Sequence, residues 1–183
     1  MSEENAESEE EKKIIRNAIN LLRSLNKPLL ISEITKERIR RASEKIGKGD
    51  IGFKSFVLAS SNYRQWNTLT DSDDAEALKA QMKIFAEKPL VDDFDIPAVV
   101  YEILVKEGFN LNSLVKEVTV GDMKVWKVKD GERNLVITFQ SSITQVQAEL
   151  LKLTDNDTFV CFDSALDDTT KINLARNFII KVI

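Results

Sequence analysis

Residues 114–139 read LVKEVTVGDMKVWKVKDGERNLVITF, and this stretch decides the fold. Apolar and polar residues alternate along it, and a period of two is typical of a β-strand with one buried face. Gly121-Asp122 and Asp130-Gly131 interrupt the alternation, as short glycine-containing pairs do in hairpin turns. The expected strands are 114–120, 125–128 and 135–139. The sequence therefore predicts a small antiparallel meander.

Beyond residue 139 the pattern changes to strands that alternate with helices. We expect a helix over 143–153, a strand over 159–162, a helix over 169–178 and a final strand ending at Ile183. Alternation of this kind favours parallel strands joined by right-handed crossovers. The predicted fold class is mixed α/β (α+β): N-terminal helices, then a short antiparallel meander that merges into a βαβαβ parallel unit at the C-terminus.

Upstream of the meander, apolar residues recur mainly at helical spacing. We expect a disordered acidic tail over 1–10, an N-terminal amphipathic helix and linker over 11–30, and a single globular domain over 31–183. Pro28 ends the first helix because proline lacks an amide hydrogen. A second helix is expected to begin at a cap, Ser32 or Thr35, and to run to Ile46, where Gly47 and Gly49 end it. A strand-length apolar run follows at 53–58. Two more helices are expected, over 75–87 and from Asp95 to Gly108.

Composition and charge exclude several classes of function. The chain carries 26 Lys and Arg against 30 Asp and Glu, so any contact with DNA must come from a local patch. Cys161 is the single cysteine and histidine is absent, which excludes an intramolecular disulfide, a cysteine-built metal site and histidine-dependent catalysis. No window approaches eighteen uninterrupted apolar residues, so we expect no membrane partner and a soluble, cytoplasmic protein.

Basic residues gather on the helix that ends at Ile46. Arg38, Arg41 and Lys45 lie three and four residues apart, so they share a helix face that could neutralise phosphates. The alternative is a solvated basic face, or one that pairs with the acidic segment 71–95. The residues expected to bind nucleic acid are Lys36, Arg38, Arg40, Arg41 and Lys45.

A polar and aromatic turn follows the apolar run at 53–58. It contains Asn62, Tyr63 and Trp66, a combination typical of an interface or of a platform on which bases stack. The simpler interpretation is a tight turn with Trp66 packed on the core, since tryptophan is buried in most proteins.

An acidic group follows the strand expected over 159–162. Asp163, Asp167 and Asp168 lie where ligands bind in open α/β sheets and could hold a magnesium ion. The simpler interpretation is that Asp163 closes the strand and that Asp167 or Asp168 caps the next helix. Cys161, within the strand, is expected to be a small buried apolar residue, not a nucleophile.

The chain resembles a known family over 31–183. The resemblance is carried by ITKERIRRA at 34–42, GFKSF at 52–56, Ser60-Ser61-Asn62 with Trp66, and FVCFDSA at 159–165 followed by Lys171-Ile172-Asn173. In these stretches the chain resembles the carboxy-terminal portion of the modification (Mod) subunit of type III restriction-modification systems. That family consists of adenine-specific DNA methyltransferases.

The resemblance implies a non-catalytic module, as a separate or truncated chain, that serves subunit assembly and could contact DNA. The family's catalytic body is marked by an Asp-Pro-Pro-Tyr type motif and by a Phe-x-Gly-x-Gly type loop for S-adenosylmethionine, and neither occurs in this sequence. We therefore expect no catalytic residue, metal or cofactor in this chain. The implied partners are a methyltransferase body or a second Mod copy, the restriction subunit and, as an open option, duplex DNA.

Two functions of other kinds stay open from the residues alone. One is a stand-alone DNA-binding accessory protein that uses the basic helix. The other is a metal-dependent phosphoryl-transfer or nuclease enzyme at the Asp163 group.

Overall fold

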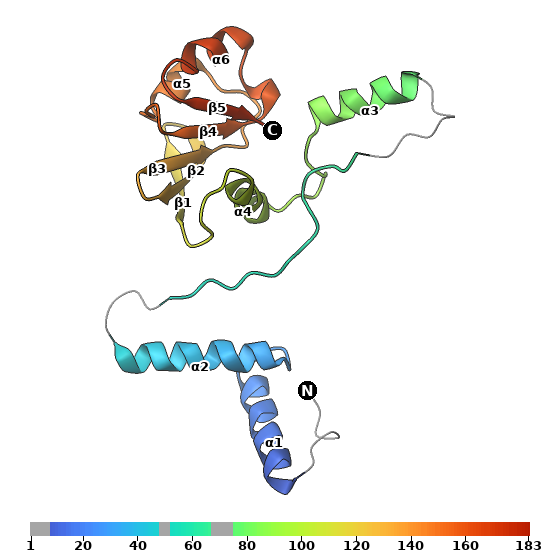
Figure 1. Ribbon diagram of the computed structural model, residues 1–183, viewed down its shortest axis with the longest axis vertical. Helices are drawn as coiled ribbons and strands as arrows, with labels where there is room; N and C mark the ends of the chain where they lie inside the picture. The colour runs from blue at the N-terminus through green and yellow to red at the C-terminus, as the bar shows by residue number, and fades with distance from the viewer. Residues whose placement is uncertain (1–7, 48–51, 67–74) are drawn as a thin grey trace. The chain divides into compact units, whose positions relative to one another are not determined.

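The computed structural model describes residues 8–47, 52–66 and 75–183 (Figure 1). The chain forms two compact units that divide between Val57 and Leu58. This division falls inside 31–183, the segment that we expected to be a single domain. The difference arises because the second helix packs with the first, so that the two helices belong to one unit.

The first unit contains the helices α1 (Glu9–Ser24) and α2 (Ile31–Ile46). Ser8 caps α1, because its Oγ accepts the Glu11 amide hydrogen at 3.2 Å while the Glu11 carboxylate accepts the Ser8 amide hydrogen at 3.3 Å. The helix thus begins inside the stretch expected to be a disordered tail. Residues 1–7 of that tail lie outside the described residues.

The ends of α2 differ in how well the sequence predicted them. Leu30 precedes its first turn without a side-chain cap, so neither Ser32 nor Thr35 has the expected capping role. Gly47 ends the helix with φ +62°, a left-handed backbone that glycine adopts without strain, as expected. Gly49 lies outside the described residues.

No strand forms at 53–58. Residues 52–61 have no regular secondary structure, and no strand in the described part of the chain pairs with them. A short apolar run is compatible with a strand, but a strand also needs a neighbour to satisfy its amide and carbonyl groups.

The second unit is built on a five-stranded sheet in the order β1-β2-β3-β4-β5. Its strands are β1 (Leu114–Val120), β2 (Met123–Asp130), β3 (Arg133–Ile137), β4 (Thr158–Cys161) and β5 (Ile179–Val182). The first three pair antiparallel, and β3, β4 and β5 pair parallel. The predicted fold class is confirmed, including the meander that merges into a parallel unit.

Two-residue loops join the antiparallel strands and set their register. Gly121 and Gly131 occupy the first position of each loop with φ of +63° and +62°. Tight hairpin turns require this left-handed backbone at that position, and glycine adopts it at no steric cost.

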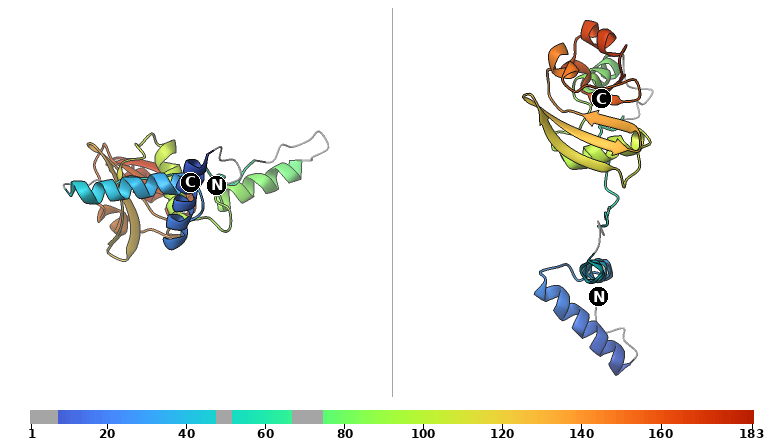
Figure 2. Two further views of the ribbon diagram at one scale, coloured as in Figure 1. Left: turned by 90° about the horizontal axis from the view of Figure 1, so that it is seen from below. Right: turned by 90° about the vertical axis from the view of Figure 1, so that its left-hand side faces the viewer.

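Helices cover both faces of the sheet (Figures 1 and 2). The helices of this unit are α3 (Ala75–Glu87), α4 (Ile96–Lys106), α5 (Gln145–Glu149) and α6 (Asp168–Leu174), with a short 3-10 turn at Asp163–Ala165. Phe159 and Cys161 pack in the core cluster that includes α5 and α6, while Val160 between them packs in the cluster that includes α4. None of the helices in the described parts of the chain combines the length and apolar composition of a membrane span.

Candidate functional site

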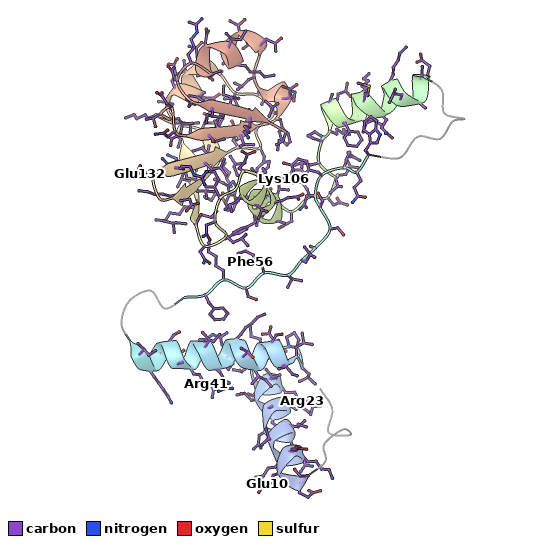
Figure 3. All side chains as sticks on the ribbon, in the orientation of Figure 1. Glu10, Arg23, Arg41, Phe56, Lys106 and Glu132 are labelled. Carbon is purple, nitrogen blue, oxygen red and sulfur yellow. The ribbon has the colours of Figure 1, made fainter. Side chains whose placement is uncertain are left out.

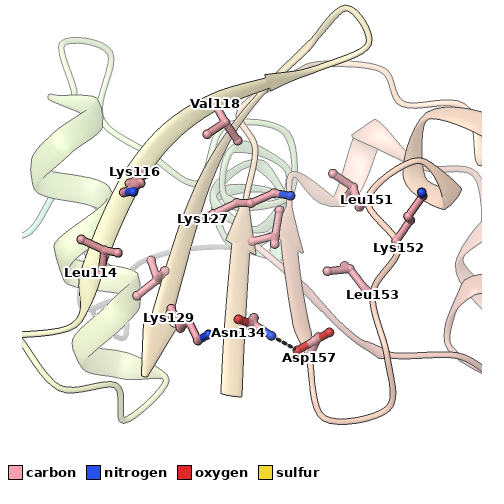
Figure 4. Close-up of a pocket in the computed structure, with 12 residues that line it drawn as sticks. Leu114, Lys116, Val118, Lys127, Lys129, Asn134, Leu151, Lys152, Leu153 and Asp157 are labelled. Carbon is pink, nitrogen blue, oxygen red and sulfur yellow. Dashed lines mark hydrogen bonds between the residues drawn. The ribbon is translucent and has the colours of Figure 1, made fainter. Parts of the chain in front are cut away.

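An open hollow of about 340 Å³ lies on the α5/α6 face of the sheet, over β1 and β2 (Figure 4). We term it the lysine groove, after its residues Lys116, Lys127, Lys129 and Lys152. The first three come from β1 and β2, and Lys152 comes from the loop between α5 and β4.

The groove exists because α5 covers only one end of the β1–β2 hairpin. Gln147 of α5 donates through Nε2 to Asp122 Oδ1 in the hairpin loop at 2.8 Å. Leu150 follows the helix and lies beside Gly121, so the loop end of the hairpin is covered. The helix then stops, and Leu114 at the other end of β1 stays 56% exposed.

The strand register places three of the lysines together. Lys127 and Lys129 flank Val128, so both side chains leave the same face of β2. Lys116 of β1 stands directly opposite Lys127. All four groove lysines are exposed, and none forms an ion pair within residues 8–47, 52–66 and 75–183.

We expect Lys116→Gln to stabilise the second unit. Like charges directly opposite each other in an antiparallel pair are unfavourable, so the free energy of unfolding should rise by about 0.2–1 kcal/mol at low salt. The gain should fade at high salt because ions screen exposed charges. Urea unfolding followed by tryptophan fluorescence reports on this unit, since Trp66 and Trp126 are the only two tryptophans and both belong to it.

A matched control is Lys124→Gln. Lys124 Nζ lies 3.0 Å from the Glu117 carboxylate, so its removal breaks a favourable pair and should give no gain. A Lys116→Gln protein that is less stable than wild type at low salt would contradict the interpretation of the groove as a site of charge repulsion.

One carboxylate, that of Asp157, lines the groove and is buried. Asn134 Nδ2 donates to its Oδ1 at 2.7 Å, and the amide and hydroxyl of Thr154 donate to its Oδ2 at 2.9 and 3.0 Å. Burial raises the pKa of Asp157, but the hydrogen bonds from Asn134 and Thr154 outweigh burial and hold the pKa below its usual value. One oxygen is therefore committed to Asn134 of β3 and the other to Thr154 in the turn before β4.

The groove is suited to holding an anion. It presents four ammonium groups, each with three donors and no acceptor. Asp157 is the one carboxylate among its described lining residues, and its oxygens already accept three hydrogen bonds. The arrangement therefore presents net positive charge to a ligand.

The basic residues expected to bind nucleic acid lie on α2 (Figure 3 labels Arg41). Lys36 Nζ lies 2.7 Å from the Glu33 carboxylate. Arg40 and Arg41 both pair with Glu37, which is only 7% exposed, and the Arg41 Nε to Glu37 Oε1 distance is 2.8 Å.

The carboxylates of α2 itself thus neutralise much of the charge that the sequence concentrates there. Arg38 and Lys45 are exposed and form no ion pair with another described residue. Ion pairs three or four residues apart are ordinary stabilising features of helices, so they explain most of the basic face without a ligand. Binding of nucleic acid by these residues stays a prediction.

Asn62 and Tyr63 attach their segment to α4. The Asn62 amide hydrogen is donated to Glu102 Oε2 at 2.9 Å. Lys106 Nζ of α4 lies 3.1 Å from the centre of the Tyr63 ring, which is a cation–π contact (Figure 3 labels Lys106). Burial, followed by the charge of Glu102, raises the pKa of Tyr63 to about 12. Both residues therefore have structural partners inside the second unit.

Trp66 is not packed on the core as the simpler interpretation held. It is 50% exposed and contacts Phe85 of α3, with ring centroids 5.1 Å apart. The ring pair joins this segment to α3, a helix that contains no buried residue. A role at an interface stays a prediction for this residue.

The acidic group after β4 is divided among structural partners. Asp163 Oδ1 lies 2.7 Å from Lys171 Nζ, and Asp168 lies 3.9 Å from the same ammonium. Asp167 caps α6, because its oxygens accept the amide hydrogen and the hydroxyl of Thr170 at 2.9 and 2.7 Å. Of the two caps that the simpler interpretation offered, Asp167 and Asp168, the structure has Asp167.

Cys161 is fully buried on β4, as expected. Burial raises the pKa of its thiol to about 11, so the thiolate that a nucleophile requires is disfavoured. Among the described residues, no group of three or more acidic, histidine or cysteine side chains is placed to hold a metal ion.

A second exposed surface is the apolar segment, residues 53–58. Val57 is 87% exposed and Leu58 is 100% exposed, and Phe53 is exposed on nearly half of its surface. Single exposed apolar residues are common, but adjacent ones outside regular structure are typical of contact sites.

The lysine groove was missed at the sequence level although its signals were present. Lysines at 127 and 129 alternate with apolar residues, which places them on one face of a strand. The two-residue loop after Val120 then pairs 120 with 123 and hence 116 with 127. Runs of charge along the chain reveal neither the alternation within β2 nor the pairing of β1 with β2.

Comparison of the chain with protein-family models, with curated proteins and with solved structures found no match. Within residues 8–47, 52–66 and 75–183, the lysine groove and the apolar segment are the candidate contact surfaces.

Proposed function

We propose that this chain is a non-catalytic assembly module of a type III modification methyltransferase, and that the apolar segment binds the methyltransferase body. The observation that carries the proposal is the full exposure of Leu58 beside Val57. Leaving such side chains in water costs free energy that burial against a partner would recover, at about 1.5–3 kcal/mol for each.

The resemblance supports the choice of partner. The motif at 52–56 is among the residues that carry it, and it overlaps the apolar segment. In the family, the region that this chain resembles follows the methyltransferase body. A segment without a neighbouring strand can also add to the edge of a partner's sheet, where backbone hydrogen bonds give affinity and alternate side chains fill pockets.

The experiment is co-purification with a methyltransferase body that carries the Asp-Pro-Pro-Tyr motif. We expect Val57→Ser combined with Leu58→Ser to weaken the complex at least about 100-fold. Two buried apolar side chains at about 1.5–3 kcal/mol each contribute about 3 kcal/mol or more, and about 1.4 kcal/mol corresponds to a factor of ten in affinity. Isothermal titration measures the affinity. The variant should keep wild-type stability, since both side chains are exposed in the free chain.

A matched control replaces two exposed valines elsewhere, Val105→Ser and Val146→Ser. This control should bind as wild type does. Wild-type protein that fails to bind the methyltransferase body, or equal affinity of both double variants, would overturn the proposal. Self-association of the wild-type chain that the Val57→Ser, Leu58→Ser variant loses would assign the segment to a second copy instead.

A further inference from the structure

We infer that the lysine groove binds the phosphodiester backbone of a nucleic acid. This site is separate from the basic helix α2 and from the apolar segment. The inference rests on the position of Lys116, Lys127 and Lys129 on one sheet face, with Lys152 at the side of the same hollow (Figure 4).

The charge of the groove is a local exception in an acidic chain. The formal net charge is −4, yet none of the four groove lysines has a carboxylate partner among the described residues. Asp157, the carboxylate in the lining, is buried and accepts its hydrogen bonds from Asn134 and Thr154. A bound polyanion would relieve the repulsion between Lys116 and Lys127, which the fold by itself maintains.

The spacing of the lysines suits an extended polyanion. Residues two apart on a strand lie about 6.7 Å apart, so Lys127 and Lys129 can reach successive negative groups along a chain. Lys116 lies on the adjacent strand, about 5 Å across from Lys127. Lysine ammonium groups act as point charges for phosphate, and they need no fixed approach angle.

The composition of the groove favours a nucleic acid over an acidic protein. Interfaces between proteins are depleted in lysine and enriched in arginine and aromatic residues. The described lining of the groove has four lysines and neither arginine nor an aromatic residue. The described lining has no aromatic ring on which a base could stack and no arginine guanidinium that could bind a base edge. The groove should therefore contact the nucleic-acid backbone, and its affinity should not depend on base sequence.

The test is fluorescence anisotropy of labelled 20-nucleotide DNA, as a duplex and as a single strand, titrated with the full chain from low to physiological salt. We expect Lys116→Gln, Lys127→Gln and Lys129→Gln together to weaken duplex binding at least about tenfold at low salt. The slope of log K against log salt should become shallower by about 2.7, at about 0.9 for each lost phosphate contact.

The control is a triple variant of equal charge change outside the groove: Lys79→Gln, Lys83→Gln and Lys124→Gln. These lysines pair with Glu76, Glu87 and Glu117, and their removal should leave binding near wild type. Arg38→Gln with Lys45→Gln tests the separate prediction for α2 in the same assay, and a loss of binding there would leave the expected effect of the groove variant unchanged. Lys127→Arg keeps the charge and should keep the affinity.

Three outcomes would overturn the inference. One is the absence of binding to either DNA at low salt, and another is equal loss in both triple variants, which would assign binding to bulk charge. The third is stronger competition by polyglutamate than by DNA of equal charge, which would make the groove a dock for an acidic protein. If the triple groove variant unfolds at a lower urea concentration than wild type, Lys116→Gln alone takes its place in the binding assay. The slope of log K against log salt should then become shallower by about 0.9.

Discussion

Phe159→Ala should lower the free energy of unfolding of the second unit by about 3–5 kcal/mol. Phe159 lies on β4 and is fully buried. Its ring meets that of Phe178 edge-on, with centroids 6.1 Å apart and an interplanar angle of 89°. The substitution removes this contact and leaves a cavity between the sheet and α6.

The position of β4 adds to the expected cost. Its neighbours β3 and β5 both pair with it in parallel, so it has no free edge along which to shift and fill the cavity. Single domains are stable by about 5–15 kcal/mol, so the loss would take a large share of the total. Urea unfolding followed by tryptophan fluorescence measures it.

Ile172→Ala on α6 is the control, because Ile172 is exposed and its removal should cost less than about 0.5 kcal/mol. The circular-dichroism signal that α1 and α2 contribute provides a second check, since the first unit contributes no residue to this core. A Phe159→Ala protein within about 1 kcal/mol of wild type would show that the core repacks.

Asp157→Ala should cost about 3 kcal/mol at neutral pH. The Asn134 amide and the Thr154 amide would both lose a buried charged acceptor, and each orphaned donor costs about 1–3 kcal/mol. Asp157→Asn should cost less, because the Asn134 side chain can rotate and present its oxygen to the new amide. Urea unfolding of the three proteins gives both differences.

The effect of Asp157→Ala should depend on pH with a definite sign. Because the folded pKa of Asp157 lies below its unfolded value, its stabilising contribution is fully present above the unfolded value of about 3.9. The contribution is lost as pH falls through the folded pKa. The difference between wild type and Asp157→Ala should therefore be constant from pH 7 to 5 and shrink below pH 4. An equal difference at pH 3 and pH 7 would refute the role of the ionised form.

The fold of the second unit was largely predictable from the sequence. Alternation over 114–139 and glycine in the loops fix both the strands and the turns, because a period of two is meaningful only in a strand with one buried face. The parallel half followed from alternating strands and helices. Helix α5 was predicted too long, at 143–153, because its apolar pattern continues past Glu149 while Lys152 adopts φ +53°.

The first unit and the candidate site were less predictable. The apolar run at 53–58 fits a strand by composition, but nothing local shows whether a neighbour exists. The charge excess near Lys36 suggested a ligand surface, whereas Glu33 and Glu37 at helical spacing pair with much of it. The lysine groove depends on pairing between two strands, which counting along one strand does not detect.

The two-residue turn at Gly121 has a consequence for how chains related to this one can be recognised. Inserting or deleting one residue between Val120 and Met123 would shift the pairing of β1 and β2, and a shift by one moves every side chain of a strand to the opposite face. Lys116 would then leave the groove without any lysine being mutated. Relatives that share the groove should therefore keep the length of this turn, while single lysines can exchange with arginine at little cost.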